Sequence, residues 1–388
     1  MRKILLYALA IVILPWSIAS AGPRTLKVGI DDWPGYYAAN QFTEPKGLKI
    51  EPVMVTDINE RWQKLAGGNL DLAGCTLDAF TLGAARHNPG ALLFKIDTSF
   101  GSDAIVAKKS IKTINEMAGK RVTYTEGMPS HYLLAFFLNI IGKSTADVKT
   151  MPVRDVKDAY ENLISGKADV AVLWEPHVTN AVRQGNHILI SSRNADLIED
   201  ICVANFKVLK DRKADIQLFV NAWFSVIKLL SQNPGMARKL ISQRSGIPSK
   251  DLDDAFPGIK FASHEENKKW KARAVANMKQ AQQVWVFEGL QNAGNPIVFG
   301  GVTHFWYLDS ARPESGPGLF GNVKFSVNKN VIGQQEKEKK LSVKEIQGKT
   351  EELARLKFKT IHFATASATI APDSQKVIEY LAGVLNRF

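Results

Sequence analysis

Short apolar runs alternate with amphipathic stretches from Thr25 onward, and this alternation sets the expected architecture. Runs rich in β-branched residues predict strands at residues 26–30, 49–55, 70–75, 120–124, 169–174 and 201–209. Stretches with helical spacing predict helices at residues 36–42, 59–66, 131–141, 155–163, 214–231, 234–242 and 265–288. Strands that alternate with helices are typical of βαβ units, so the pattern predicts an α/β protein with mostly parallel sheets.

The order of these elements predicts two lobes joined by a hinge. The length of 388 residues is too great for one simple core. We expect residues 22–104 and 202–328 to form the first lobe and residues 105–201 to form the second. A chain that leaves one lobe, builds another and returns must cross twice, and two crossings make a natural hinge.

The N-terminus has the pattern of a secretory signal. Arg2 and Lys3 precede an apolar run at residues 4–16, and Ala19-Ser20-Ala21 offers the small residues that a signal peptidase reads. Because the run is too short to span a bilayer, residues 1–21 are interpreted as a cleaved signal peptide rather than an uncleaved anchor. No cysteine lies near Ala21, which excludes a lipid on a new N-terminal Cys, and no later stretch is apolar enough to cross a membrane.

Charge and cysteine content narrow the function classes. The formal net charge is +12, or +10 once Arg2 and Lys3 are removed. A basic exported protein can attract anionic ligands. The lysines are scattered and no basic stripe interleaved with aromatic residues occurs, so we expect no nucleic-acid partner. Cys75 and Cys202 form no Cys/His cluster with metal spacing. They are interpreted as two separate buried thiols, and no metal or cofactor is expected.

Polar side chains follow the ends of several predicted strands, which is where open α/β sheets bind ligands. These segments are residues 31–36, 74–78, 125–131 and 174–177, and a fifth, residues 100–104, lies at an expected crossing between the lobes. Thr76 and Ser130 are placed to cap the helices that follow, whose free N–H groups bind anions or polar head groups. Trp174 can stack on a ligand, and Glu175 can accept hydrogen bonds from an amine or a hydroxyl. Asp103 and Asp169 fit capping roles in turns.

Several segments in register resemble one family. Residues 102–107, 119–122, 127–134 and 166–176, with residues 29–36 and 68–78, resemble the nitrate/sulfonate/taurine-type substrate-binding proteins of ABC importers. The resemblance covers roughly residues 25–300. It implies a type II periplasmic-binding-protein fold that closes on a small solute in the periplasm, presents it to an ABC permease, acts as a monomer and is not an enzyme. The family's pocket elements map onto Trp33, Tyr36, Thr76, Asp78, Ser102, Ser130, His131, Trp174 and Glu175.

The end of the chain resembles a different family. Residues 329–357 are polar and charged and are interpreted as a linker. Residues 358–388 are similar to the start of an OmpA-like peptidoglycan-binding domain, a partial α+β unit. The parts of that family that contact peptidoglycan would follow Phe388, so no residue is assigned to peptidoglycan. We therefore expect a fragment of a longer protein held at the cell wall; the alternative is a short amphipathic extension.

The sequence leaves the ligand class and two other functions open. The basic charge and the helix N-termini favour an anion such as a sulfonate, taurine or nitrate. Asp78 and Glu175 favour an amine-bearing or heterocyclic ligand, because an unpaired carboxylate facing a buried anion is costly. The other functions are an envelope-tethered sensor or scaffold, and an enzyme like the thiamine-pyrimidine synthases that resemble these binding proteins. The Cys-rich iron motif of those enzymes is absent here.

Overall fold

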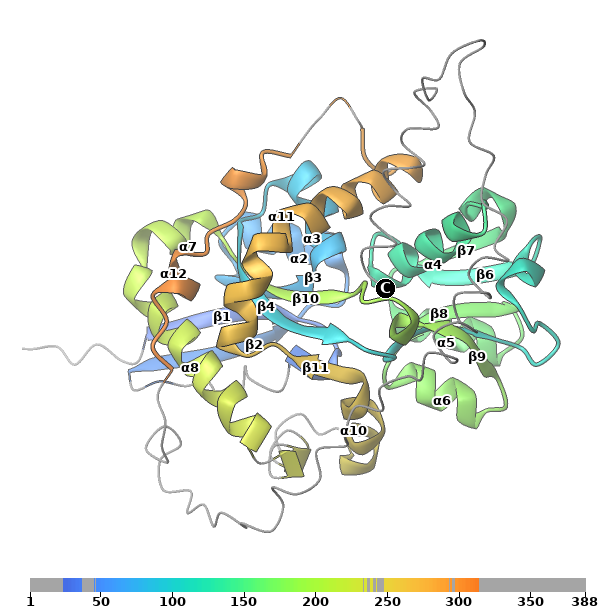
Figure 1. The fold of residues 1–388 in the computed structure, drawn as a ribbon, viewed down its shortest axis with the longest axis horizontal. Coiled ribbons are helices and arrows are strands. Elements are labelled where there is room, and N and C mark those ends of the chain that lie inside the picture. Colours follow the sequence, from blue (N-terminus) through green and yellow to red (C-terminus); the bar gives the residue numbers. More distant parts are fainter. Residues whose placement is uncertain are drawn as a thin grey trace, which may run out of the picture.

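Two β-sheets, each covered by helices, make up the chain in the computed structural model (Figure 1). The structure describes residues 24–36, 45, 47–232, 234–235, 238–239, 242, 248–292, 294 and 297–313. The predictions for the signal peptide at 1–21, the linker at 329–357 and the tail at 358–388 lie outside the described residues. So do most of the predicted helix at 36–42 and part of that at 234–242.

The first lobe is built on a six-stranded sheet with the order β11-β4-β10-β3-β1-β2. Its strands are β1 (Arg24–Ile30), β2 (Leu48–Met54), β3 (Leu72–Thr76), β4 (Ala91–Ser99), β10 (Glu199–Ala204) and β11 (Ile259–Phe261). Its helices are α2 (Ile58–Ala66), α3 (Leu77–His87), α7 (Phe206–Asp211), α8 (Lys213–Gln232), α10 (Ser249–Ala255), α11 (His264–Phe287) and α12 (Trp306–Asp309). The indoles of Trp62, Trp223 and Trp270 are fully buried among these elements, so the sheet and its helices share one apolar core.

The second lobe is built on a five-stranded sheet with the order β7-β6-β8-β5-β9. Its strands are β5 (Asp103–Ala107), β6 (Arg121–Thr125), β7 (Lys149–Val153), β8 (Val170–Trp174) and β9 (His187–Ser191). Its helices are α4 (Pro129–Ile140), α5 (Val156–Ile164) and α6 (His177–Arg183). Helix α4 is buried along almost its whole length, and the C-terminal part of α11 packs on it through Trp285. The long α11 helix therefore contacts both lobes.

The chain crosses between the sheets twice, at residues 100–102 between β4 and β5 and at residues 192–198 between β9 and β10. Both strands that begin after a crossing, β5 and β10, run antiparallel to each of their neighbours. Five of the nine described strand pairs are therefore antiparallel. The α/β prediction is confirmed, but the expectation of mostly parallel sheets is wrong, because each crossing returns a strand against the direction of its neighbours and β11 adds a further antiparallel pair with β4.

The predicted strand at residues 201–209 is strand in its first half and helix in its second. Strand β10 ends at Ala204, and α7 begins at Phe206. Asn205 lies between them, where its side-chain oxygen accepts a 2.7 Å hydrogen bond from the N–H of Val208. Its side-chain amide donates to the carbonyl of Leu70 at 2.7 Å. One capping side chain thus ends the strand and starts the helix, which overrides the apolar pattern.

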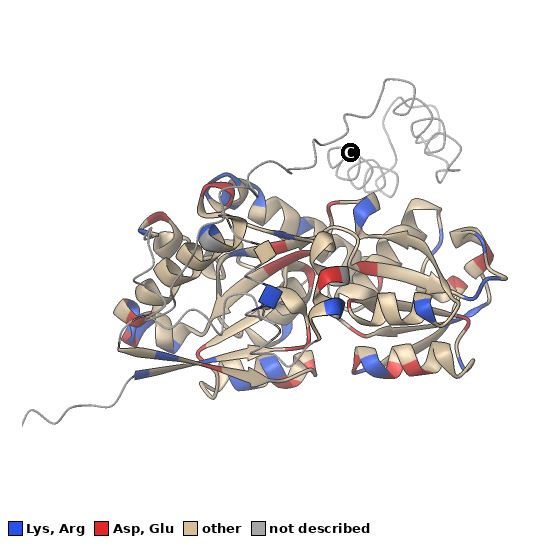
Figure 2. Ribbon diagram, turned by 90° about the horizontal axis from the view of Figure 1, so that it is seen from below, with Lys and Arg blue, Asp and Glu red and all other residues tan. Residues whose placement is uncertain are grey.

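Two expectations from composition hold in the described residues. Cys75 and Cys202 are free and buried, as predicted. Lys and Arg residues are scattered over both lobes rather than gathered into a stripe (Figure 2). None of the helices that the structure describes is both long and apolar enough to cross a membrane.

Candidate functional site

A pocket lies where the two lobes meet. It encloses about 320 Å³, a volume that includes its open mouth. Both lobes and the second crossing supply its lining, which consists of Asp31, Trp33, Tyr36, Ile58, Cys75, Thr76, Asp103, Met128, Pro129, Trp174, Ile198 and Asp200. Every lining residue is buried, so the described conformation is closed around the pocket.

The position of the pocket follows from strand direction. The lining residues after β1, at the end of β3, after β6 and at the end of β8 all come from the carboxyl ends of parallel strands. Such edges are the usual ligand sites of open α/β sheets. Asp103 and Asp200 reach the same edge from the other direction, because they stand at or near the start of the antiparallel strands β5 and β10.

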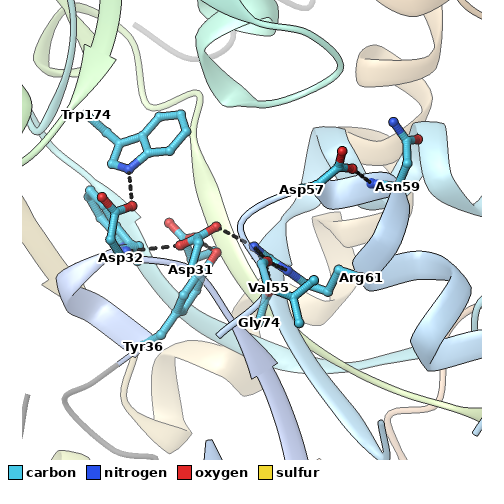
Figure 3. Close-up of polar contacts among 11 residues, drawn as sticks. Asp31, Asp32, Tyr36, Val55, Asp57, Asn59, Arg61, Gly74 and Trp174 are labelled. Atoms are coloured by element: carbon cyan, nitrogen blue, oxygen red, sulfur yellow. Dashed lines mark hydrogen bonds and ion pairs between the residues drawn. The ribbon is translucent and has the colours of Figure 1, made fainter. Parts of the chain in front are cut away.

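A buried arginine supports the floor of the pocket. Arg61 is fully buried, and its Nη2 lies 2.8 Å from Asp31 Oδ2 (Figure 3). Its guanidinium also donates to the carbonyls of Val55, at 2.9 and 2.7 Å, and Gly74, at 2.7 Å. Burial raises the pKa of Asp31 and the charge of Arg61 opposes that rise. All three guanidinium nitrogens are therefore engaged within the lobe.

Two aromatic side chains of the lining are held by buried carboxyl groups. Trp33 Nε1 donates to Asp97 Oδ2 at 3.2 Å, and the Tyr36 hydroxyl donates to Asp200 Oδ1 at 2.5 Å. Asp97 and Asp200 are directly paired across β4 and β10. These four side chains, from the segment after β1, from β4 and from β10, thus depend on one another for their positions.

The carboxyl groups around the pocket resist ionisation. Burial raises the pKa of Asp97 and of Asp103 to about 7. Burial, and then the charge of Asp97, raises the pKa of Asp200 well above its ordinary value. Asp78, behind the pocket in the first turn of α3, also has a pKa raised to about 7 by burial. Neither of its carboxyl oxygens has a hydrogen-bond partner among the described residues.

A contact beside the pocket joins the two lobes. Trp174 Nε1, at the end of β8, donates to Asp32 Oδ1 at 2.9 Å (Figure 3). His177 Nε2 lies 3.1 Å from Asp32 Oδ2. A single carboxylate of the first lobe therefore holds two side chains of the second.

Four of the nine residues predicted to bind a ligand line this pocket: Trp33, Tyr36, Thr76 and Trp174. Thr76 occupies the N-cap position of α3, but its side chain makes no capping hydrogen bond. The other five predicted residues, Asp78, Ser102, Ser130, His131 and Glu175, are buried outside the lining.

Those five residues have structural partners. The carbonyl of Ser102 accepts from the N–H of Glu175 at 2.9 Å, which joins the first crossing to β8. Glu175 receives hydrogen bonds from the N–H and hydroxyl of Thr179. Trp285 Nε1 donates to the carbonyl of Asp78 at 2.8 Å. We expected Ser130 to be the N-cap of α4, but Met128 occupies that position. The Ser130 hydroxyl hydrogen-bonds the backbone N–H and carbonyl of Thr125 instead.

His131 is a core histidine. Its ring packs 4.5 Å from Tyr124 and 5.5 Å from Trp285, centroid to centroid. Burial lowers its pKa to about 4, so the ring is neutral at physiological pH.

The sequence interpretation missed the acidic part of the lining. Asp103 was expected to cap a turn, and Asp200 was not singled out at all. The available signal was the Glu199-Asp200 pair ahead of an apolar strand, since carboxylates rarely precede a buried strand without a partner. Among the described residues, no group of three His, Cys, Asp or Glu side chains is placed to hold a metal ion.

Comparison with known proteins identifies the family. The family model described as NMT1/THI5 like matches residues 33–237, which is 205 of 388 residues. The chain belongs to the NMT1/THI5-like family. A protein of Brucella abortus (strain 2308) named as a binding protein is 23% identical over 247 residues, covering 62% of this chain and 71% of the relative.

Solved structures with the same fold include binding proteins and an enzyme. The periplasmic aliphatic sulphonate binding protein SsuA from Escherichia coli is similar with a TM-score of 0.61 and 17% identity, covering 80% of this chain and 100% of that one. The desulfurization enzyme DszB is similar with a TM-score of 0.54 and 13% identity, covering 74% and 98%. The predicted periplasmic-binding-protein fold is therefore confirmed for this NMT1/THI5-like chain.

Proposed function

We propose that this chain is the solute-binding component of an ABC-type importer, which captures a small polar solute by closing its two lobes. The proposal rests on the buried pocket, which both lobes line, and on the contact between Trp174 and Asp32, which joins the lobes. A pocket of this kind opens and closes when the lobes rotate about the two crossings. The binding proteins among its relatives support the same reading.

The proposal also covers the location of the protein and the partners that it binds. The chain is exported by cleavage of residues 1–21, works in the periplasm as a monomer and delivers its solute to an ABC permease. Residues 329–357 serve as a linker, and the OmpA-like tail at 358–388 begins a unit that holds the protein at peptidoglycan. The alternative, a tethered sensor or scaffold, uses the same pocket with a different partner. Retention of the chain by a permease supports the importer, whereas solute binding without such retention supports the sensor or scaffold.

One observation favours a second function, an enzyme that uses a thiol. Cys75 lines the pocket, and DszB shows that this fold can carry catalysis. The pKa of Cys75 opposes that function, because burial raises it well above the ordinary value and keeps the thiol protonated. A reactive thiol needs the opposite environment. We therefore favour binding without chemistry.

The experiment is a binding screen with a shape readout. The full chain is tested by thermal shift against sulfonates, taurine, nitrate, guanidinium compounds and pyrimidines, and each hit is followed by small-angle X-ray scattering. A solute of the importer should raise the melting temperature and reduce the radius of gyration. A Cys75→Ala variant should keep both responses. Failure of every solute, or conversion of a hit to product that depends on Cys75, would overturn the proposal.

A further inference from the structure

The pocket is acidic, although the protein as a whole is basic. Three of its described lining residues are carboxylic acids, namely Asp31, Asp103 and Asp200, and no other described lining residue is charged. Only Asp31 has a guanidinium partner, Arg61, at 2.8 Å. Asp103 and Asp200 are each 2% exposed and have no described ion-pair partner. Burying such groups without a counter-charge is costly.

Among the described residues, no nearby cation is free to neutralise them. The titratable groups that surround Asp103 and Asp200 are Asp31, Tyr36, Arg61, Cys75, Asp78, Lys95, Asp97, Glu175 and Cys202. The two cations in this set are both committed elsewhere. Arg61 bonds Asp31 and two carbonyls, and Lys95 lies 3.3 Å from Glu199.

The helix N-termini at the pocket are also poorly suited to an anion. In α3 the first turn already contains a buried carboxyl, Asp78. In α4 the first residue, Pro129, has no N–H. The neighbouring amides of Met128 and His131 donate to the carbonyls of Thr125 and Met128, at 3.4 and 2.9 Å. The N–H groups that would receive a sulfonate are therefore few.

We infer that the solute carries a positive charge on a small planar or compact nitrogen group, which lies against Asp103 and Asp200 beside the rings of Trp33, Tyr36 and Trp174. Aromatic walls and carboxylates together form a site for ammonium, guanidinium or amidinium groups. No group of three or more His, Cys, Asp or Glu among the described residues is placed to hold a metal ion, which favours an organic cation. This inference rests on the proposed function and assigns its ligand class.

The raised pKa values of Asp103 and Asp200 predict that cation binding depends on pH. Burial favours their protonated forms in the empty pocket, and a bound cation favours the ionised forms. Binding near pH 7 should therefore release protons, and affinity should rise with pH through that region.

The test compares ligands of equal shape and different charge. Isothermal titration of the full chain uses three sets: guanidinium, urea and nitrate; acetamidinium, acetamide and acetate; benzamidinium, benzamide and benzoate. The cation should bind at least about tenfold more tightly than the other members of its set. Its apparent enthalpy should also change with the ionisation enthalpy of the buffer, which reports proton release.

Two carboxyl-to-amide variants provide the test and its control. Asp200→Asn should weaken cation binding at least about tenfold. Glu265→Gln alters an exposed carboxyl in the first turn of α11, whose ion-pair partner at 2.9 Å is Lys268, and should leave affinity unchanged. If Asp200→Asn does not fold, Asp103→Asn serves in its place.

The outcomes separate this inference from the proposed function. An anion or neutral molecule that leads any set, or an anionic hit in the broader screen, overturns the assignment of charge while solute binding stands. If neither the three sets nor the broader screen yields binding, the proposed function fails and the inference fails with it.

Discussion

Trp174 and Asp32 belong to different lobes, and the indole N–H of the first donates a 2.9 Å hydrogen bond to the carboxylate of the second (Figure 3). His177 Nε2 lies 3.1 Å from the other oxygen of the same carboxylate, Asp32 Oδ2. Because it joins the two lobes, as the 3.6 Å ion pair between Arg154 and Asp57 also does, this pair is expected to favour the closed form over the open one. The effect on ligand affinity then follows from linkage, since a ligand enclosed by both lobes binds the closed form.

Trp174→Phe should shift the lobes toward the open form. The variant removes a hydrogen bond to a charged group while keeping an aromatic ring, and ligand affinity should fall about tenfold. Small-angle scattering of the ligand-free protein should show a larger radius of gyration. Trp270→Phe is the matched control, because its N–H also donates to a carboxylate at 2.9 Å, that of Glu199, but within one lobe. An equal change in affinity and radius of gyration in both variants would show that the contact between Trp174 and Asp32 does not control lobe closure.

Asp78→Asn should stabilise the protein at pH 8 and not at pH 4. The folded carboxyl titrates at about 7 and an unfolded one near its ordinary value of 3.8, so the folded state holds the extra proton between these values. Stability from this group is thus present at low pH and is lost as pH rises toward 7. The neutral amide avoids that loss, which is worth about 2–4 kcal/mol at pH 8. Urea unfolding at the two pH values measures it.

Asp169→Asn should change the stability in the opposite direction, and it serves as the control for the measurements at different pH. Hydrogen bonds from Arg121, and then from Lys108, lower the pKa of Asp169. Its contribution is therefore present above the unfolded value and is lost as pH falls. The variant should be less stable than the parent at pH 8. Parallel behaviour of the two variants would contradict the assignment of Asp78 as a carboxyl buried without a partner.

Strand periodicity made most of the fold predictable, but not the acidic pocket. The predicted strand at 49–55 lies within one residue of β2, and the helix at 265–288 within one residue of α11. The rule that ligands bind at strand carboxyl ends found Trp33, Thr76 and Trp174. It could not find Asp103 and Asp200, since these lie at the starts of antiparallel strands and reach the same edge only through the two crossings.

The same rule also placed in the pocket two side chains that do not line it. Ser130 and His131 follow β6 at the same edge, yet both are buried outside the described lining. Trp285, more than 150 residues later in the chain, packs on the His131 ring and decides its environment. A contact at such sequence separation is set by tertiary packing and leaves no local pattern.

Arg61→Lys should be strongly destabilising. The substitution leaves Asp31 and the carbonyls of Val55 and Gly74 with one ammonium in place of a fully engaged guanidinium. Loss of a buried pair of this kind costs about 3–5 kcal/mol. Lys64→Gln on the same helix removes only the exposed ion pair with Glu60 and should cost about 0.5 kcal/mol or less. Denaturant midpoints compare the two, and similar costs would mean that the buried network contributes little.

Gly35→Ala should damage the pocket while the protein remains folded. A Cβ atom at residue 35 would fall inside van der Waals contact of both Asp97 Oδ2 and Trp33 Nε1, the two atoms that hydrogen-bond at 3.2 Å. The indole must then move, so ligand affinity should fall about tenfold and stability by about 1–3 kcal/mol. Gly300→Ala is the control, because no atom lies within 4 Å of its added Cβ. Calorimetry gives the affinity and tryptophan fluorescence reports the indole. Unchanged affinity and emission in Gly35→Ala would show that the bond between Trp33 and Asp97 does not position the ligand.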